Sequence, residues 1–312
     1  MGKRFWLIGI LFTFVLLPWS PASAQPPPKL KVIASLFPLQ EFARKVGGDK
    51  VQVVLLLPPG AEAHTWEPKP SDVVRISQAD VFIYIGPSLE PWIDKVLRAV
   101  QNKKLRVLEA SRGLPLIKAE EAEEGTGHSY GSRTPEKMDP HIWLDFALDQ
   151  KIVEAIAAAF SEIDPPHAAF YKSNAGIYEG QLNELDQKYR QALAKCRHRQ
   201  ILLSGHSALA YLARRYGLQQ TALSGISPDA EPTPKKMAGV IETAQKTGIK
   251  FIYVEELVNP KLAQALSKEA GVGVLILNEG HNLTPQQVKQ KVTFLELMEK
   301  NLENLVKGLE CQ

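Results

Sequence analysis

Short apolar runs alternate with helical patterns along most of the chain, and this alternation restricts the fold more than any other feature of the sequence. The runs are almost continuously apolar and rich in Val and Ile, as in parallel strands that helices cover on both faces. We expect strands at 31–35, 51–57, 81–85, 105–108, 201–204, 221–224, 251–254 and 274–277. We expect helices at 37–46, 71–77, 92–99, 208–216, 234–247 and 260–270. This order predicts an α/β fold with parallel sheets.

The expected strands divide into two groups of four, so the sequence predicts two similar lobes. Between them, 164–195 contains Asp-Pro-Pro at its start and then no further proline. Asp as a cap and Pro in the first turn are typical of a helix beginning there. Apolar residues follow at roughly helical spacing. We expect one rigid linking helix of about 30 residues, or about 45 Å. The alternative is two helices with a break near Gly176 or Gly180.

These boundaries divide the chain into an N-terminal metal-binding lobe at 25–163, the linking helix at 164–195 and a C-terminal metal-binding lobe at 196–312. Residues 1–24 have the features of a secretory signal peptide: Lys3 and Arg4, an apolar run, and the small residues Ala-Ser-Ala at the end. The run is shorter than the roughly 20 residues of a membrane-spanning helix, which is the alternative. No cysteine stands at the cleavage site, so we expect a protein free in a periplasm or outside the cell.

Three of the seven histidines occur in similar settings. His64, His141 and His206 each follow an expected strand within a loop or precede a helix, and glycine or proline lies nearby. In open α/β sheets, ligands bind beyond the carboxyl ends of the strands, so residues from both lobes can meet there. Neutral imidazole binds zinc, copper, nickel and iron better than hard cations. Singly, each histidine is more often an ordinary surface or core residue, but together they predict a transition-metal site.

A metal-bound histidine usually donates its second ring N–H to a carboxylate or carbonyl. Asp145 lies four residues after His141 and is a candidate for this role. The alternative is that Asp145 caps the helix expected at 148–160, and both roles are compatible.

Several motifs of the mature chain carry a family resemblance. They are the Gly-Ala-x-x-His-x-x-Glu-Pro-x-Pro-Ser-Asp run at 60–72, the Asp-Pro-His-Ile-Trp-Leu-Asp run at 139–145, His206 with 211–218, and the segment 225–234. With these, the chain resembles the zinc- and manganese-binding solute receptors of bacterial ABC importers, the ZnuA/TroA-like proteins. The resemblance covers nearly all of the mature chain.

The resemblance implies two Rossmann-like lobes joined by a rigid helix, with the metal bound between them. It assigns the first three ligands to His64, His141 and His206. Zinc receptors carry His at the third position and manganese receptors often carry Glu, so His206 favours Zn²⁺ as the transported ligand. The expected function is high-affinity capture of Zn²⁺ in the periplasm and delivery to the permease of an ABC-type importer.

The fourth ligand departs from the family pattern. The family usually has an aspartate just after the last strand, but Asn278 stands there in this chain. Because zinc prefers four tetrahedral ligands, we expect Glu279 to complete the site, with His281 and then water as the alternatives.

Two further features of the sequence concern a loop and the cysteines. The stretch 119–138 is rich in glutamate, contains His128 and lacks apolar periodicity, so we expect a solvated loop, with an accessory metal-collecting role as the alternative. Cys196 and Cys311 both fall at the end of the second sheet away from the metal, where a disulfide is as plausible as two separate thiols.

The residues favour metal capture over other functions. A zinc hydrolase needs an open coordination position and a base, and the chain contains no His-Glu-x-x-His motif, so we expect no enzyme. A manganese or iron receptor, or a surface adhesin of the same fold, is the nearer alternative. The formal net charge falls from +3 to +1 when Lys3 and Arg4 are removed, so we expect no nucleic-acid partner. We expect a monomer.

Overall fold

The computed structural model describes residues 29–119, 138–225, 232–257 and 261–312. The expected signal peptide at 1–24, His128 with most of the acidic stretch, and most of the 225–234 motif lie outside these residues. Within the described part of the chain, no helix is both long enough and apolar enough to cross a membrane.

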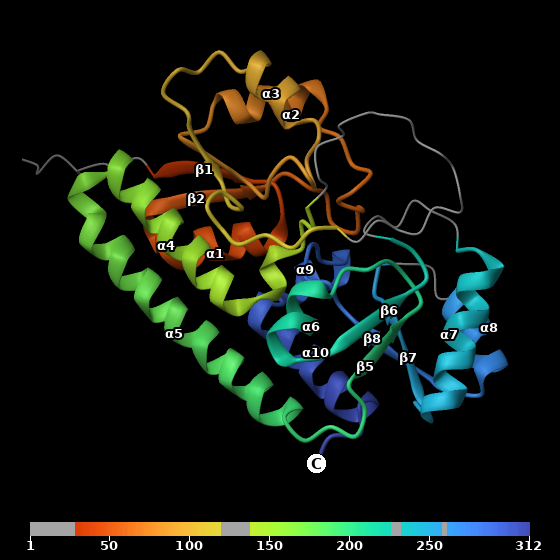
Figure 1. Ribbon diagram of the computed structural model, residues 1–312. Helices are drawn as coiled ribbons and strands as arrows, with labels where there is room; N and C mark the ends of the chain where they lie inside the picture. The colour runs from red at the N-terminus through yellow and green to blue at the C-terminus, as the bar shows by residue number, and fades with distance from the viewer. Residues whose placement is uncertain (1–28, 120–137, 226–231, 258–260) are drawn as a thin grey trace, which may run out of the picture.

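Two parallel four-stranded sheets form the two lobes (Figure 1). The first has the order β2-β1-β3-β4 and the second has the order β6-β5-β7-β8. Their strands are β1 Leu30–Ala34, β2 Val51–Leu55, β3 Val81–Tyr84, β4 Arg106–Glu109, β5 Gln200–Leu203, β6 Gln219–Ala222, β7 Phe251–Glu255 and β8 Gly273–Leu277. Each lies within two residues of a predicted strand, so the prediction of parallel α/β lobes is confirmed.

Helices connect and cover the strands. They are α1 Phe37–Gly47, α2 Pro70–Ser77, α3 Ile93–Ala99, α4 Phe146–Ile163, α5 Ala168–Leu193, α6 Ala210–Tyr216, α7 Pro234–Thr247, α8 Lys261–Ala270, α9 Pro285–Gln290 and α10 Phe294–Gly308. Short 3-10 turns occur at Gly48–Lys50, Ile142–Leu144 and Pro165–His167. In the first sheet, β2 lies on one side of β1 and β3 on the other. In the second sheet, β6 and β7 flank β5 in the same way. The order of the strands therefore reverses at the first strand of each sheet. Ligands bind beyond the carboxyl ends of strands at such a reversal.

The linking segment contains one uninterrupted helix, α5, of 26 residues, which runs along both lobes in Figure 1. At 1.5 Å per residue its length is about 39 Å. The alternative break at Gly176 or Gly180 is wrong, because both glycines lie inside α5. The 3-10 turn Pro165–His167 precedes the helix, and the Asp164 carboxylate accepts hydrogen bonds from His167 Nδ1 at 2.7 Å and Tyr171 Oη at 2.6 Å.

Packing ties α5 to both lobes. Its buried face includes Tyr171, Tyr178 and Tyr189, whereas Ile177 is 63% exposed. One contiguous apolar cluster extends from the first sheet through α5 to α10 and the second sheet. The Tyr189 hydroxyl donates to the Met298 carbonyl of α10 at 2.6 Å. The lobes therefore share a core, and their facing ends are held in a fixed relation.

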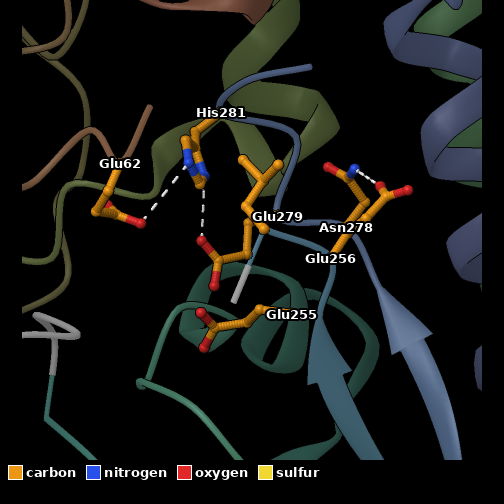
Figure 2. Close-up of a pocket in the computed structure, with 7 residues that line it drawn as sticks. Glu62, Glu255, Glu256, Asn278, Glu279 and His281 are labelled. Atoms are coloured by element: carbon orange, nitrogen blue, oxygen red, sulfur yellow. Dashed lines mark hydrogen bonds and ion pairs between the residues drawn. The ribbon is translucent and has the colours of Figure 1, made fainter. Parts of the chain in front are cut away.

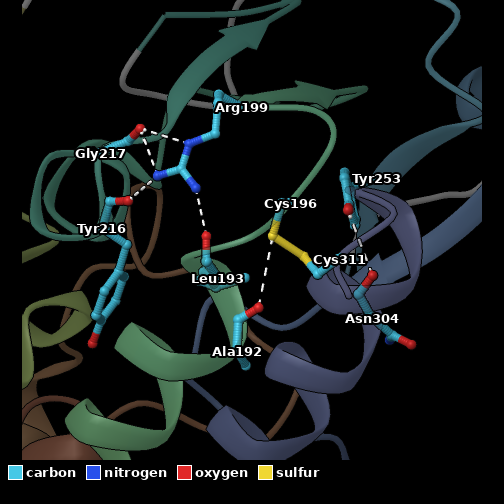
Figure 3. The surroundings of a disulfide bond; sticks show 9 residues. All are labelled: Ala192, Leu193, Cys196, Arg199, Tyr216, Gly217, Tyr253, Asn304 and Cys311. Atoms are coloured by element: carbon cyan, nitrogen blue, oxygen red, sulfur yellow. Dashed lines mark hydrogen bonds between the residues drawn. A yellow bond between two sulfur atoms is a disulfide. The ribbon is translucent and has the colours of Figure 1, made fainter.

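A disulfide joins Cys196 to Cys311 (Figure 3). Cys196 precedes β5 and Cys311 follows α10, so the bond lies at the amino ends of the second sheet's strands, as predicted. Nearby, the Arg199 guanidinium donates to the Leu193 carbonyl of α5 and to the Tyr216 carbonyl of α6. Cationic side chains commonly stabilise helix carboxyl termini in this way. Covalent and charged contacts therefore stabilise this end of the lobe, away from His64, His141 and His206.

Candidate metal centre

His64, His141 and His206 come together between the lobes, at the carboxyl ends of the strands. Their ring nitrogens lie within 4.8 Å of one another. The Nε2 atom of His141 is 3.2 Å from Nε2 of His64 and 3.2 Å from Nε2 of His206. Two nitrogens bound to a tetrahedral zinc ion at 2.0–2.1 Å would lie about 3.3 Å apart. The two Nε2 separations from His141 therefore match the edge of a zinc tetrahedron, and the ligand atoms of His64 and His206 lie within 4.8 Å of each other.

His64 lies in the loop between β2 and α2, and it is the most accessible of the three. Its backbone N–H donates to the Glu62 carboxylate at 3.0 Å. The Gly60 N–H donates to the Leu283 carbonyl at 2.9 Å, so this first-lobe loop is fixed to a segment that follows the second sheet. Gly60 has φ of 78°, a backbone conformation that favours glycine.

His141 is 1% exposed and is held by Asp139. One carboxylate oxygen of Asp139 accepts from the His141 backbone N–H at 2.9 Å and from Nδ1 at 2.7 Å. Because a carboxylate on Nδ1 requires the proton there, Nε2 of the neutral ring carries a lone pair toward the site.

The predicted orienting role of Asp145 is therefore wrong. Asp145 caps α4 by accepting from the Ala147 N–H at 3.0 Å, and it also accepts from Arg215 at 2.8 Å. The ion pair with Arg215 and the helix cap both use the Asp145 carboxylate. Asp139 lies two residues before His141, and this short separation places its carboxylate oxygen within hydrogen-bond distance of the His141 ring.

His206 is fully buried and has an analogous partner in Glu255, the last residue of β7. One Glu255 oxygen accepts from the His206 backbone N–H at 2.7 Å and from Nδ1 at 3.0 Å. A Cβ at position 205 would lie only 1.8 Å from that oxygen, so Gly205 permits the approach. Glu255 was not predicted from the sequence. Its position at the carboxyl end of the strand beside β5 was the available signal.

The electrostatics of the three rings differ. Burial, together with the neighbouring imidazoles, lowers the pKa of His64 to about 2. Burial also lowers the pKa of His141, more than Asp139 raises it. At His206 burial acts in the same direction, but Glu279, Glu255 and Glu62 outweigh it and raise the pKa to about 9. Two rings are thus ready to bind metal near pH 7, and at His206 a metal cation would replace a proton.

The segment after β8 places Glu279 and His281, the two residues predicted as candidates for the fourth ligand, beside Asn278 around a small pocket (Figure 2). Glu279 lies with one oxygen 3.3 Å from Nδ1 of His206 and the other 3.1 Å from Nδ1 of His281. It belongs to a second group of possible ligand atoms with His206 and Glu255, on the side of His206 away from Nε2. Burial raises the pKa of Glu279 well above its usual range.

The Asn278 side chain forms hydrogen bonds within the turn after β8 and with Glu256. Its side-chain oxygen accepts from the Gly280 N–H at 2.7 Å, and its amide donates to Glu256. Asn301 binds the Asn278 backbone at 2.8 Å and 2.6 Å. This hydrogen-bonding holds the turn that carries Glu279 and His281.

Comparison with known proteins gives a consistent set of relatives. The family model described as "ZnuA: Zinc-uptake complex component A periplasmic" matches residues 32–308. The high-affinity zinc uptake system protein ZnuA of Bacillus subtilis is 33% identical over 281 residues, which cover 90% of this chain and 88% of that protein. The zinc-binding lipoprotein AdcA of Streptococcus pneumoniae is 36% identical over 278 residues, or 89% of this chain. The chain spans only 55% of the AdcA length.

Solved structures agree with the fold. The Zn(II)-bound ZnuA-like domain of Streptococcus pneumoniae AdcA has a TM-score of 0.76 and 34% identity, covering 90% of this chain and 99% of that one. The laminin-binding protein of Streptococcus agalactiae, described as having adhesin and metal-transporting activity, has a TM-score of 0.77 and 31% identity over 90% of this chain and 99% of that one.

Proposed function

The chain belongs to the family of periplasmic zinc-uptake complex components, whose model matches residues 32–308, and we propose that it captures Zn²⁺ outside the cytoplasm and delivers it to an ABC-type importer. The convergence of the three histidines, with His141 Nε2 at zinc-ligand spacing from Nε2 of both His64 and His206, carries this proposal. His64 and His141 come from the first lobe and His206 from the second. A bound ion would therefore connect the two lobes.

The ligand set supports zinc over manganese or iron. Three imidazole nitrogens suit a borderline cation, and divalent zinc binds such sites more tightly than manganese or iron does. The fourth position is to be filled from the turn after β8, where the sequence analysis expected Glu279. Asp139 and Glu255 orient His141 and His206, as outer carboxylates do in zinc sites.

Capture and release suit the site better than catalysis does. His141 and His206 are 1% and 0% exposed, so a bound ion would have little open space for a substrate. A catalytic zinc keeps a position for water or substrate. We accordingly assign no enzymatic role and propose that the importer's permease, at the membrane, is the protein partner. The protein is proposed to act as a periplasmic monomer after removal of residues 1–24.

A competition titration against a chromophoric zinc chelator tests the proposal. Loss of an outer-shell partner typically costs 10–100-fold in metal affinity, so removal of a ligand in His206→Ala should cost at least about 100-fold. The control is His167→Ala, because His167 lies at the start of the linking helix and contacts Asp164. Unchanged zinc affinity in His206→Ala, with both variants folded, would refute the site. Tighter binding of Mn²⁺ than of Zn²⁺ by the wild type would instead favour the manganese receptor.

A further inference from the structure

Helix α6 of the second lobe lies against the segment of the first lobe that carries His141. The helix spans Ala210–Tyr216 and begins four residues after His206. It packs against the 3-10 turn Ile142–Leu144, which directly follows His141. One short helix is therefore joined to a candidate ligand of its own lobe and packed beside a candidate ligand of the other lobe.

Tyr211 connects α6 to the start of this segment. Its side chain is fully buried, and its hydroxyl donates to the Asp139 carbonyl at 3.0 Å. The same hydroxyl accepts from the Ile117 N–H at 3.0 Å, and the Asp139 N–H donates to the Ile117 carbonyl at 2.8 Å. Because the Asp139 carboxylate orients the His141 ring, Tyr211 holds the residue on which that orientation depends.

Arg215 connects α6 to the end of the same segment. It lies four residues after Tyr211, so the two side chains leave the same face of the helix. Its Nη1 donates to Asp145 at 2.8 Å, and its Nε and Nη2 donate to the two oxygens of Asp186 in α5 at 2.6 Å and 2.8 Å. The Arg215 side chain is only 13% exposed. Bidentate, charge-assisted pairs of this kind are strong and fix the geometry of both partners.

The alternative is that these contacts only stabilise the fold, as buried hydrogen bonds do wherever they lie. Their partners favour a further role, because Tyr211 and Arg215 hold positions 139 and 145, on either side of His141. Tyr189 provides a contrast. Its hydroxyl is equally buried and donates to the Met298 carbonyl at 2.6 Å, which lies outside the 139–145 segment.

Resting on the proposed function, we propose that Tyr211 and Arg215 are positioning residues for zinc, which hold the 139–145 segment of the first lobe in place relative to His206 of the second. Neither residue binds the ion. Tyr211 acts through Asp139, and Arg215 acts through Asp145. A site binds more tightly when its ligands are already ordered before the ion arrives. When either end of the segment is loosened, binding must also order His141, and zinc affinity falls.

Chelator competition with Zn²⁺ on the full mature chain tests this proposal. Tyr211→Phe removes the hydroxyl and keeps the ring, and it should lower zinc affinity about 10-fold, at the lower end of the range for outer-shell partners. Arg215→Lys keeps the charge but loses the planar fork, so we expect a smaller loss of a few fold. Tyr189→Phe is the matched control and should leave zinc affinity unchanged.

A double variant separates positioning from general stability. If Tyr211 acts through Asp139, Tyr211→Phe should cost much less affinity in an Asp139→Asn background than in the wild type, because the two residues belong to one chain of contacts. Equal losses in the two backgrounds would overturn the proposal. It would also be overturned by unchanged affinity in Tyr211→Phe, or by an equal loss in Tyr189→Phe.

The variant His206→Ala keeps this proposal distinct from the proposed function. If His206→Ala loses zinc while Tyr211→Phe binds it as the wild type does, only the positioning role is wrong. Retention of zinc by His206→Ala would instead refute the whole site. Thermal unfolding of the metal-free variants shows whether each is folded.

Discussion

The two sheets have the same strand order but differ at the ends that face each other. At the first sheet, the buried Glu90 carboxylate accepts from the Ser35 hydroxyl at 2.6 Å and from the backbone N–H groups of Ile85 and Gly86 at 3.2 Å and 2.8 Å. At the carboxyl end of β7 in the second sheet, Glu255 accepts from His206. Glu90 accepts hydrogen bonds from within its own lobe, and Glu255 orients a histidine of the candidate metal centre.

This difference shows that the same strand order can hold a carboxylate that stabilises its own lobe and a carboxylate that orients a histidine. The point where the chain reverses direction exposes strand ends in both sheets, and any carboxylate there needs donors. In the first lobe, backbone groups and a serine supply them, and the histidines come from loops at positions 64 and 141. In the second lobe, a histidine that follows β5 supplies them directly. The comparison predicts that a change at Glu90 affects stability and that a change at Glu255 affects metal binding.

The largest expected effect concerns the disulfide, which crosslinks only the second lobe. Replacing both cysteines in Cys196→Ser/Cys311→Ser opens a loop with a sequence separation of 115 residues. Loss of a crosslink over a loop of that length should lower the free energy of unfolding by about 4–5 kcal/mol. Denaturant unfolding would measure it. Zinc affinity of the folded variant should stay within a few fold, and a large loss of affinity would contradict the separation of the two ends of this lobe.

The second prediction concerns Glu90. Burial raises its pKa from 4.5 to about 7, more than its hydrogen bonds lower it. The folded protein therefore binds this proton more tightly than the unfolded chain does. The resulting stability is present below pH 4.5 and is lost as the pH rises toward 7. Over that interval the wild type should lose up to about 3 kcal/mol more than Glu90→Gln. Parallel pH profiles of the two proteins would contradict the prediction, and zinc affinity should not differ between them.

The third prediction applies the equivalent change to the second lobe. Glu255→Gln keeps the shape of the side chain but no longer fixes the proton on Nδ1 of His206. We expect zinc affinity to fall about 10–100-fold, or about 1.4–2.7 kcal/mol. Chelator competition measures this loss, with Glu90→Gln as the matched control in the first lobe. Equal affinities in the two variants would show that the two sheet ends do not differ in function.

The smallest expected effect concerns the link between the lobes. Gly176 and Gly180 lie inside α5, and a Cβ added at either would have no neighbour within 4 Å. Alanine favours a helix over glycine by roughly 1 kcal/mol, so Gly176→Ala should raise the free energy of unfolding by about that amount. Denaturant unfolding with Gly180→Ala as a second case measures the change. A destabilisation would mean that flexibility at this point of the helix is part of the native structure.

Much of the fold follows from the sequence because strand and helix periods are local. All eight strands and the linking helix appear within a few residues of their expected positions. It was harder to predict which face of α5 is buried. Ile177 is exposed and Tyr178 is buried, because α5 packs against both lobes and α4. Apolar character alone does not identify that face.

The site could be predicted only in part. Glycine and proline around His64, His141 and His206 mark loops at strand ends, so their convergence was foreseeable. The partner of His206 depends on a contact between distant positions, because Glu255 is 49 residues away, whereas Asp139 is only two residues from His141. The role of Asp145 was misassigned because Arg215, 70 residues away, competes for its carboxylate. Local sequence does not reveal such competition.

The most direct test of the account is the metal content of the intact protein, measured by native mass spectrometry after purification without chelators. The account predicts one zinc ion per wild-type chain and none in His206→Ala under the same conditions. Manganese in the wild type, or zinc retained in full by His206→Ala, would contradict it.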